Sequence, residues 1–290
     1  MKLCIISGPE GDDVKQHFLE EAQKLFDTVV YAPLHELRIE CGDGKTTILN
    51  KNTDLSTFDA IYPRVFVHDF LFIETLIDAL EETGVYLPFS LEGYQATIHK
   101  FLSVERVARI GVPVPDSSLT ITPHVALAMS KKIGFPIVLK LLRGFGGKGV
   151  MMLKSEEELR PVLDTLQVFN EFPLSQKFIP NEGHDIRALV IGDDVLGIKR
   201  QSEGTEWRAN VSQGGSAELV DLDENITEMA RQIATFLGMD ICGVDFIETP
   251  DGPVFLEVNC TPGIFKDYFG SGLAKKMLEH IYNRVSSSSP

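Results

Sequence analysis

Three residues with hard oxygen ligands lie close together in the C-terminal third of the sequence. Asp245 interrupts an otherwise apolar stretch at 241–247, and Glu257 and Asn259 follow two residues apart. The period of two in a β-strand puts Glu257 and Asn259 on one face, and pairing through the turn at 250–252 brings Asp245 near that face. A buried carboxylate is costly unless it is paired or bound to a metal. We therefore predict a site for Mg²⁺ or Mn²⁺ rather than a solvent-facing polar stripe on an edge strand.

A glycine-rich run, GFGGKG at 144–149, formally matches GxGxxG. Its glycines are Gly144, Gly146, Gly147 and Gly149. A dinucleotide-binding loop opens a helix, but residues 150–153 read as a strand and no Gly-Lys-Ser/Thr ends the loop. A strand, a glycine loop and a second strand are typical of a flap whose backbone amides close over phosphate oxygens. The alternative is an ordinary tight β-turn.

Two lysines precede this loop. Lys140 ends the apolar strand 137–139, so its charge either reaches solvent or points into a cleft, and its distance from the glycine loop favours the cleft. Lys100 lies early in the preceding predicted helix. It is either a second phosphate contact or a solvated helix charge, and the residues alone do not separate these two roles.

Arginines lie between these lysines and the acidic residues. Arg187 begins one predicted strand, Lys199 and Arg200 end the next, and Arg208 follows. The guanidinium fork suits a phosphate or a carboxylate, whereas the alternative, a surface salt-bridge network, suits Lys199 better than the arginines. Because Arg187 and Arg200 are at opposite ends of consecutive strands, we do not assume that they face one site.

The elements that position these groups begin with the N-terminal segment. Buried strands are predicted at 2–6, 28–32 and 58–64, and a helix at 69–82. Strands that alternate with helices predict a small parallel sheet, with a short hairpin within residues 35–57. We assign this domain to residues 1–95.

Two further units follow, at 96–180 and 181–290. The first is expected to contain a helix at 96–110, a helix from Thr122-Pro123 to Gly134, the strands beside the glycine loop, and a helix opened by the capping box at Ser155. The second is expected to contain a hairpin turning at 192–194. Its other expected elements are helices at 224–237 and 266–283 and strands at 241–248 and 254–258.

Composition excludes several classes of protein. The 290 residues, 43% hydrophobic and 24% charged, describe a globular chain of about two compact units. The net charge of −15 argues against nonspecific binding to nucleic acid or anionic membranes. Residues 131–216 are nevertheless near neutral, with 12 basic and 11 acidic side chains. The four cysteines lie far apart and no apolar run spans a bilayer, so we expect reduced thiols and a cytoplasmic protein.

Taken in order, the motifs resemble the ATP-grasp superfamily and, within it, the RimK-like amino-acid ligases. The matching stretches are PIVLKLL at 136–142 with its glycine loop, QKFI at 176–179, DIR at 185–187, KRQ at 199–201, WRAN at 207–210, GGSA at 214–217, GVD at 243–245, EVNxxPG at 257–263 and DAIYPR at 59–64. The resemblance implies an α/β protein with α+β lobes. A Rossmann-like preATP-grasp domain would precede a central lobe with the glycine flap and a C-terminal lobe with the metal site, and the two lobes would clamp ATP.

The resemblance also implies a role for each matching residue. Lys100 and Lys140 would hold the α- and β-phosphates, with Lys199, Arg208 and Asn210 on the triphosphate side. Gln176, Lys177, Phe178 and Ile179 would form the hinge that reads adenine, and Asp185 would hold the ribose hydroxyls. Asp245, Glu257 and Asn259 would bind two Mg²⁺ or Mn²⁺ ions. Lys177 departs from the family, whose members commonly carry Glu there.

The implied chemistry is a ligation. A substrate carboxylate attacks the γ-phosphorus of ATP to form an acyl phosphate, and an amine then displaces phosphate to form an amide or isopeptide bond. Catalysis would be positioning plus charge neutralisation, with Lys140 at the phosphates and Arg200 at the acyl-phosphate oxyanion. Arg187 and Arg64 would bind a substrate carboxylate, and the flap would exclude water.

We expect glutamate or a similar amino acid as one partner, and an acceptor carboxylate on a protein tail or a coenzyme as the other. The alternatives are a ligase acting on an amino-group carrier protein and a nonenzymatic ATP-binding regulatory protein on the same fold. A dinucleotide-dependent reductase is disfavoured by the strand after the glycine loop. The resemblance allows a homo-oligomer, either a dimer or a tetramer.

Overall fold

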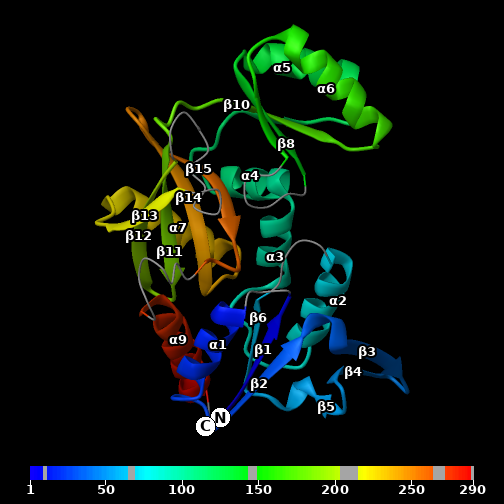
Figure 1. The fold of residues 1–290 in the computed structure, drawn as a ribbon, viewed down its shortest axis with the longest axis vertical. Helices are drawn as coiled ribbons and strands as arrows, with labels where there is room; N and C mark the ends of the chain where they lie inside the picture. The colour runs from blue at the N-terminus through cyan, green and yellow to red at the C-terminus, as the bar shows by residue number, and fades with distance from the viewer. Residues whose placement is uncertain (9–11, 65–68, 143–148, 203–214, 264–271, 289–290) are drawn as a thin grey trace.

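The computed structural model describes residues 1–8, 12–64, 69–142, 149–202, 215–263 and 272–288. They form three units along the long axis of the molecule. The N-terminal unit lies at the bottom of Figure 1, a five-stranded sheet lies above it, and a smaller lobe lies at the top.

The N-terminal unit is built on a parallel sheet in the order β2-β1-β6. Its strands are β1 (Lys2–Ser7), β2 (Thr28–Pro33) and β6 (Ala60–Arg64), and its helices are α1 (Asp12–Ala22) and α2 (Phe70–Glu81). The predicted parallel sheet is confirmed, because β1 pairs in parallel with both neighbours. The expected hairpin is also present, as β3 (Leu37–Gly42) and β4 (Lys45–Asn50), extended by β5 (Thr53–Asp54).

The prediction of one helix at 96–110 is wrong in one respect, because the structure has two helices that are separated at His99. Helix α3 covers Leu91–Ile98 and α4 covers Lys100–Arg109, and His99 between them is extended, with φ −113° and ψ 93°. The imidazole Nδ1 of His99 accepts the N–H of Leu102 at 3.2 Å and so caps α4. This break makes Lys100 the first residue of a helix.

The smaller lobe is the central lobe of the chain. Its antiparallel sheet has the order β7-β10-β8-β9. The strands are β7 (Ser117–Leu119), β8 (Ile137–Leu141), β9 (Val150–Leu153) and β10 (Pro173–Lys177), and the helices are α5 (Pro123–Ile133) and α6 (Glu156–Val168). The predicted caps are confirmed, because the side chains of Thr122 and Ser155 accept N–H groups of the first turns of α5 and α6. The strand–loop–strand reading of β8 and β9 is confirmed by their antiparallel pairing.

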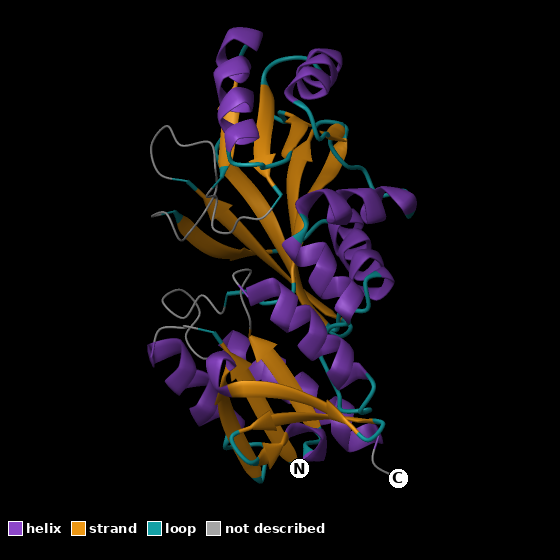
Figure 2. Ribbon diagram, turned by 90° about the vertical axis from the view of Figure 1, so that its right-hand side faces the viewer, coloured by secondary structure: helices purple, strands orange, loops and turns teal. Residues whose placement is uncertain are grey.

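The largest sheet is antiparallel and has the order β13-β12-β11-β14-β15. Its strands are β11 (His184–Ile191), β12 (Asp194–Gln201), β13 (Ser216–Val220), β14 (Ile241–Thr249) and β15 (Gly252–Asn259). Helix α7 (Glu224–Phe236) packs against β11, β12 and β14. The predicted hairpin at 192–194 joins β11 to β12, and Figure 2 shows the long strands of this sheet between the other two units.

The last helix, α9 (Gly272–Ser288), returns to the N-terminal unit and packs against α1. The rings of Phe26 and Tyr282 meet edge to face, with centroids 5.5 Å apart. The end of α9 therefore lies beside the first residue of the chain, with Ser286 Oγ 3.5 Å from Met1 Sδ. One continuous hydrophobic core joins the N-terminal sheet, α9 and the five-stranded sheet, whereas the central lobe has a separate small core around Leu139 and Leu159.

Two predictions about the chain as a whole can be compared with this fold. The four cysteines are free thiols. None of the helices in the described ranges has the length and apolar character needed to cross a membrane.

Candidate active site

A row of charged side chains crosses four strands of the five-stranded sheet. Asp185 on β11 lies directly opposite Arg200 on β12, and Arg187 lies opposite Asp245 on β14. Asp245 in turn lies opposite Glu257 on β15. Residues opposite one another in antiparallel strands project from the same face. The predicted approach of Asp245 to the face of Glu257 and Asn259 is confirmed, and we call this set the charged row.

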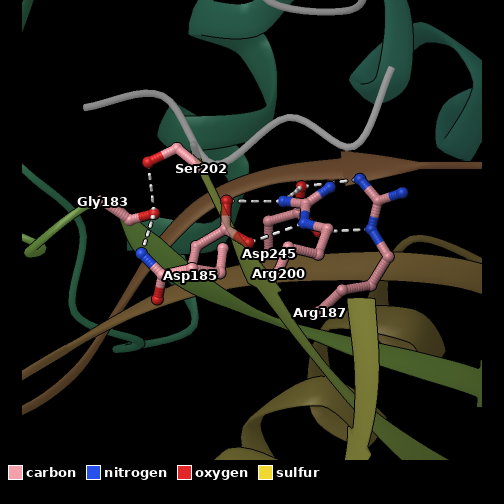
Figure 3. Close-up of polar contacts among 7 residues, drawn as sticks. Gly183, Asp185, Arg187, Arg200, Ser202 and Asp245 are labelled. Atoms are coloured by element: carbon pink, nitrogen blue, oxygen red, sulfur yellow. Dashed lines mark hydrogen bonds and ion pairs between the residues drawn. The ribbon is translucent and has the colours of Figure 1, made fainter. Parts of the chain in front are cut away.

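Two arginines converge on Asp245. Arg187 donates from Nε to Asp245 Oδ1 at 2.6 Å and from Nη2 to Oδ2 at 2.7 Å. Arg200 donates from Nη2 to the same Oδ2 at 2.7 Å. Arg200 also forms a bidentate pair with Asp185, from Nε to Oδ1 at 2.6 Å and from Nη2 to Oδ2 at 2.7 Å. Figure 3 shows both guanidinium groups side by side, directed at Asp245.

From the sequence we do not assume that Arg187 and Arg200 face one site, but the structure brings both to Asp245. Arg187 is near the start of β11 and Arg200 is near the end of β12. In an antiparallel hairpin the start of the first strand lies beside the end of the second, so opposite ends along the sequence become neighbours in space.

Four residues of the charged row are each at least nine-tenths buried, namely Asp185, Arg187, Arg200 and Asp245, and Asp245 is only 1% exposed. Burial alone would raise the pKa of the Asp245 carboxyl, but Arg187 and Arg200 outweigh it and hold that pKa below its ordinary value. Burial alone would lower the pKa of Arg200, but Asp245 and Asp185 outweigh it and raise that pKa. The arginines and Asp245 thus remain ionised, as buried charges do when they are paired and hydrogen-bonded.

Gly243 explains how Arg187 fits into this face. A Cβ at residue 243 would lie 3.2 Å from both Cδ and Nε of Arg187. The glycine of the GVD motif therefore gives the arginine stem room to lie flat across β14.

Two lysines reach the same region from outside the five-stranded sheet. The Nζ of Lys100, at the start of α4, lies 3.9 Å from Glu257 Oε2. Burial lowers the pKa of Lys140 to about 8, with Lys100 adding to the decrease while Glu257 and Asp245 oppose it. Lys140 thus lies buried close to the charged row rather than in solvent, and Lys100 pairs with Glu257 rather than carrying a solvated helix charge. Whether either lysine contacts phosphate stays a prediction.

The predicted metal ligands have the chemistry that Mg²⁺ requires. Asp245 uses three of its acceptor positions on the arginines, Asn259 Oδ1 accepts the N–H of Thr261 at 2.9 Å, and Glu257 is 44% exposed. Each of the three retains an oxygen lone pair. Among the described residues no three His, Cys, Asp or Glu side chains form a metal-binding cluster. A metal here would therefore depend on the Asn259 amide and on oxygens from the nucleotide or water, and the ligand roles stay a prediction.

Most of the predicted flap lies outside the described residues. Gly144, Gly146 and Gly147 are in that part of the chain, whereas Gly149 is described and has φ +74°, in the left-handed region. A Cβ there would be strained by this conformation, and it would also lie 3.0 Å from Leu141 Cδ1, so that the leucine side chain would have to shift.

The predicted adenine hinge begins with the last two residues of β10, Gln176 and Lys177, and continues beyond the strand. Gln176 is 2% exposed and its Nε2 donates to Ser117 Oγ at 2.9 Å. Lys177 is exposed and Phe178 and Ile179 are partly buried. Because Lys177 is exposed, its charge is accommodated at the position where the resemblance leads us to expect an acid.

Other predicted residues lie further from the charged row or outside the described chain. Arg208 and Asn210 are in the undescribed part. Lys199 points away from the face of Arg200, because side chains alternate along β12. Arg64 ends β6, and its guanidinium carbon lies 4.3 Å from the ring centre of Phe18. Burial raises the pKa of Cys260 to about 11 and Arg64 is among the groups that oppose this rise, so Arg64 is near Cys260, the residue after β15.

The sequence reasoning missed the pairing of each arginine with a carboxylate. The signal was available in the turn: if residues 192 and 193 form the hairpin loop, counting back from Ile191 and Asp194 places Asp185 opposite Arg200. It also missed His99, which ends one helix and caps the next.

Comparison with known proteins agrees with the motifs. The model of the RimK-like ATP-grasp domain matches residues 97–281. A probable alpha-L-glutamate ligase from Halorhodospira halophila is 31% identical over 286 residues, which is 97% of this chain and 95% of that protein. Another, from Rhodopirellula baltica, is 29% identical over 273 residues, which is 91% of this chain but only 66% of that protein.

A solved structure shares the fold. The Chryseobacterium gregarium RiPP-associated ATP-grasp ligase, in complex with ADP and a leader and core peptide, superposes with a TM-score of 0.74 at 19% identity and covers 100% of this chain and 97% of its own. The predicted ATP-grasp fold is thereby confirmed. Domain, relatives and fold agree: the chain belongs to the RimK-like ATP-grasp family of ligases, enzymes that form carbon–nitrogen bonds.

Proposed function

We propose that the protein is an ATP-dependent carboxylate–amine ligase that adds L-glutamate, or a similar amino acid, to an acceptor carboxylate through an acyl phosphate. The observation that carries the proposal is the charged row. It holds two buried, ionised guanidinium groups beside Glu257, Lys100 and Lys140. This is the set of charges that a triphosphate and a carboxylate require when they are brought together.

The nucleotide would lie between the central lobe and the charged row. Lys100 and Lys140 would hold its α- and β-phosphates, and Lys199, Arg208 and Asn210 remain predicted contacts on the triphosphate side. Residues 176–179 would read adenine, and the flap at 144–149 would cover the phosphates. Among the described residues, four basic groups, Lys100, Lys140, Arg187 and Arg200, face three carboxylates, a small positive excess that would favour an anionic ligand.

Asp245, Glu257 and Asn259 would hold the divalent ions. A Mg²⁺ or Mn²⁺ ion bound there supplies neutralisation of phosphate charge. Asp245 would be held in place for that role by Arg187, whose two hydrogen bonds fix the plane of the carboxylate.

The reaction would form and break bonds at phosphorus and carbon only. An oxygen of the acceptor carboxylate bonds to the γ-phosphorus as the bond to ADP breaks. The substrate amine then bonds to the acyl carbon as the carbon–oxygen bond to phosphate breaks, and the proton lost by the amine passes to the departing phosphate. Arg200 would donate from Nη1 to the oxyanion, and Arg187 and Arg64 would orient a substrate carboxylate. No protein nucleophile is required.

Glutamate is the proposed amino acid because several relatives are named alpha-L-glutamate ligases. The acceptor would be a carboxylate on a protein tail, a peptide or a coenzyme. The peptide class is supported by the fold neighbour whose structure is in complex with a leader and core peptide.

The test is incubation of the protein and a cell extract with ATP, Mg²⁺ and isotopically labelled glutamate. ADP and phosphate release would be measured, and mass spectrometry would locate the label. We expect labelled product with the wild type and none with Glu257→Gln. Glu248→Gln, an exposed change on β14, is the matched control and should retain activity. Equal labelling by wild type and Glu257→Gln would contradict the proposed site.

A further inference from the structure

Two roles compete for the Asp185 carboxylate, which is buried against Arg200. By resemblance it would accept hydrogen bonds from the ribose of ATP, but in the structure both of its oxygens accept from Arg200, at 2.6 and 2.7 Å. Asp185 is 7% exposed and Arg200 is 5% exposed. The pair is buried, bidentate and charge-assisted, which makes it strong. Each Asp185 oxygen keeps a second lone pair, but Arg200 fixes the carboxylate and only 7% of Asp185 is exposed, so a ribose hydroxyl would have little access to it.

The pair fixes the orientation of the Arg200 guanidinium. The Nε hydrogen and one Nη2 hydrogen go to Asp185, and the second Nη2 hydrogen goes to Asp245 Oδ2 at 2.7 Å. A guanidinium has five N–H donors. With these three engaged, no acceptor among the described residues contacts the two hydrogens on Nη1, and the plane in which they lie is set by Asp185.

The backbone at this end of the hairpin is also held firmly. Ser202, two residues after Arg200, donates from its N–H and from Oγ to the carbonyl oxygen of Gly183, each at 2.8 Å. Figure 3 shows this contact at one end of the charged row. These hydrogen bonds therefore hold β11 and β12 together just beyond the Asp185–Arg200 pair.

We propose that Asp185 is a positioning residue, which orients Arg200 so that Nη1 meets the oxyanion of the transferring phosphoryl group, and that it does not read the ribose. The positioning part rests on the proposed function. The ribose part concerns nucleotide binding alone and is testable without an acceptor.

The first experiment measures binding of ADP, 2′-deoxyADP and 3′-deoxyADP to the wild type in Mg²⁺ by calorimetry. If Asp185 does not contact ribose, removal of either hydroxyl should change Kd less than about threefold, and Asp185→Asn should change the Kd for ADP as little. If Asp185 binds ribose, the loss of a hydrogen bond to a charged group should weaken binding by about 10- to 100-fold. That weakening would overturn the proposal if Asp185→Asn abolishes the discrimination.

The second experiment observes Arg200 directly, again without an acceptor. In protein labelled with ¹⁵N-arginine, the Nε–H resonances of Arg187 and Arg200 should both be sharp and slow to exchange. Asp185→Asn should shift and broaden that of Arg200 while that of Arg187 persists. Asp194→Asn, the same change at the far exposed end of the same hairpin, is the matched control and should alter neither. An unchanged Arg200 resonance in Asp185→Asn would overturn the positioning role.

The third experiment is a double-mutant cycle on turnover, once an acceptor is known. Removal of one oxyanion donor typically costs about 10²- to 10³-fold in kcat. We expect Asp185→Asn and Arg200→Lys each to lower kcat on this scale with KM for ATP within about threefold. The double variant should be no slower than Arg200→Lys alone by more than about threefold, because one residue acts through the other. Multiplying effects would show that Asp185 acts independently of Arg200.

The outcomes separate the two proposals. If no acceptor supports turnover, the proposed function fails while the binding and resonance experiments still decide the role of Asp185. If Asp185→Asn does not fold, Asp185→Glu replaces it, and the deoxynucleotide comparison on the wild type is unaffected.

Discussion

The five-stranded sheet and the central lobe both bring basic side chains to the candidate site, but they surround those charges differently. On the sheet, Arg187 and Arg200 are hydrogen-bonded to Asp185 and Asp245 before any ligand arrives. On the central lobe, burial lowers the pKa of Lys140 to about 8. The sheet belongs to the continuous core of the molecule, whereas the central lobe has its own.

This difference means that the arginines of the sheet are held in place by their carboxylate partners, whereas the charge of Lys140 on the central lobe depends on a bound ligand. A buried cation that is already paired keeps its charge and its orientation, so no reorganisation is needed when the phosphoryl group transfers. A partly desolvated lysine beside another lysine has its charge stabilised when an anion binds. We infer that the sheet holds the reacting groups in place and that the central lobe responds to the nucleotide.

The largest effect should come from removing the shared carboxylate of the sheet. Asp245→Ala leaves Arg187 without its bidentate partner and removes one of the two carboxylates bound to Arg200, in a buried place. Breaking a buried ion pair typically costs about 3–5 kcal/mol. We expect a loss of this size in the free energy of unfolding, measured with a chemical denaturant.

Asp251→Ala is the matched control for that measurement. Asp251 is exposed in the turn between β14 and β15, and a surface change of this kind should stay within about 0.5 kcal/mol. An Asp245→Ala protein as stable as this control would show that the network contributes nothing to folding.

A smaller effect, about tenfold, should appear in the pH dependence of ATP binding. Above its pKa of about 8, Lys140 in the free protein loses its proton. Bound phosphates favour the protonated form, so binding takes up a proton and affinity falls as pH rises. Between about pH 7.5 and pH 9, Kd for ATP should rise by roughly tenfold. Calorimetry in buffers of different ionisation enthalpy should detect the proton uptake.

Lys140→Arg is the control for this prediction, because a guanidinium keeps its charge throughout the range. Its binding should depend on pH much less than that of the wild type. If Kd for ATP changes with pH equally in both proteins, the group that titrates is not Lys140. The sheet and the central lobe would then not differ in the protonation of their basic residues.

The smallest effect tests how closely the Arg187 side chain packs against Gly243 on the sheet. In Gly243→Ala the new Cβ would lie 3.2 Å from Arg187, so the arginine stem must shift by a few tenths of an ångström. We expect turnover to fall several-fold and stability to fall by about 1 kcal/mol, in the range of a mild overpacking. Gly42→Ala on β3, where no atom lies within 4 Å of the new Cβ, should change neither. Full turnover in Gly243→Ala would mean that Arg187 tolerates displacement.

Much of the fold could be read from local patterns. The buried strands β1 and β6, the caps Thr122 and Ser155, and the turn between β11 and β12 each depend on residues close in sequence, and each is present. The break at His99 could not be read in this way. The residues on both sides favour helix, and the imidazole that caps α4 has no strong signature.

The sequence by itself determined which residue types are available and which of them share a strand face. Alternation placed Glu257 with Asn259, and the motif order indicated the ATP-grasp family. Only the tertiary structure decided the partners: that Asp185 faces Arg200, that both arginines meet at Asp245, and that Lys140 approaches from another lobe. The physical reason is that alternation is a property of one strand, whereas a charge pair depends on the register between strands and on the packing of separate cores.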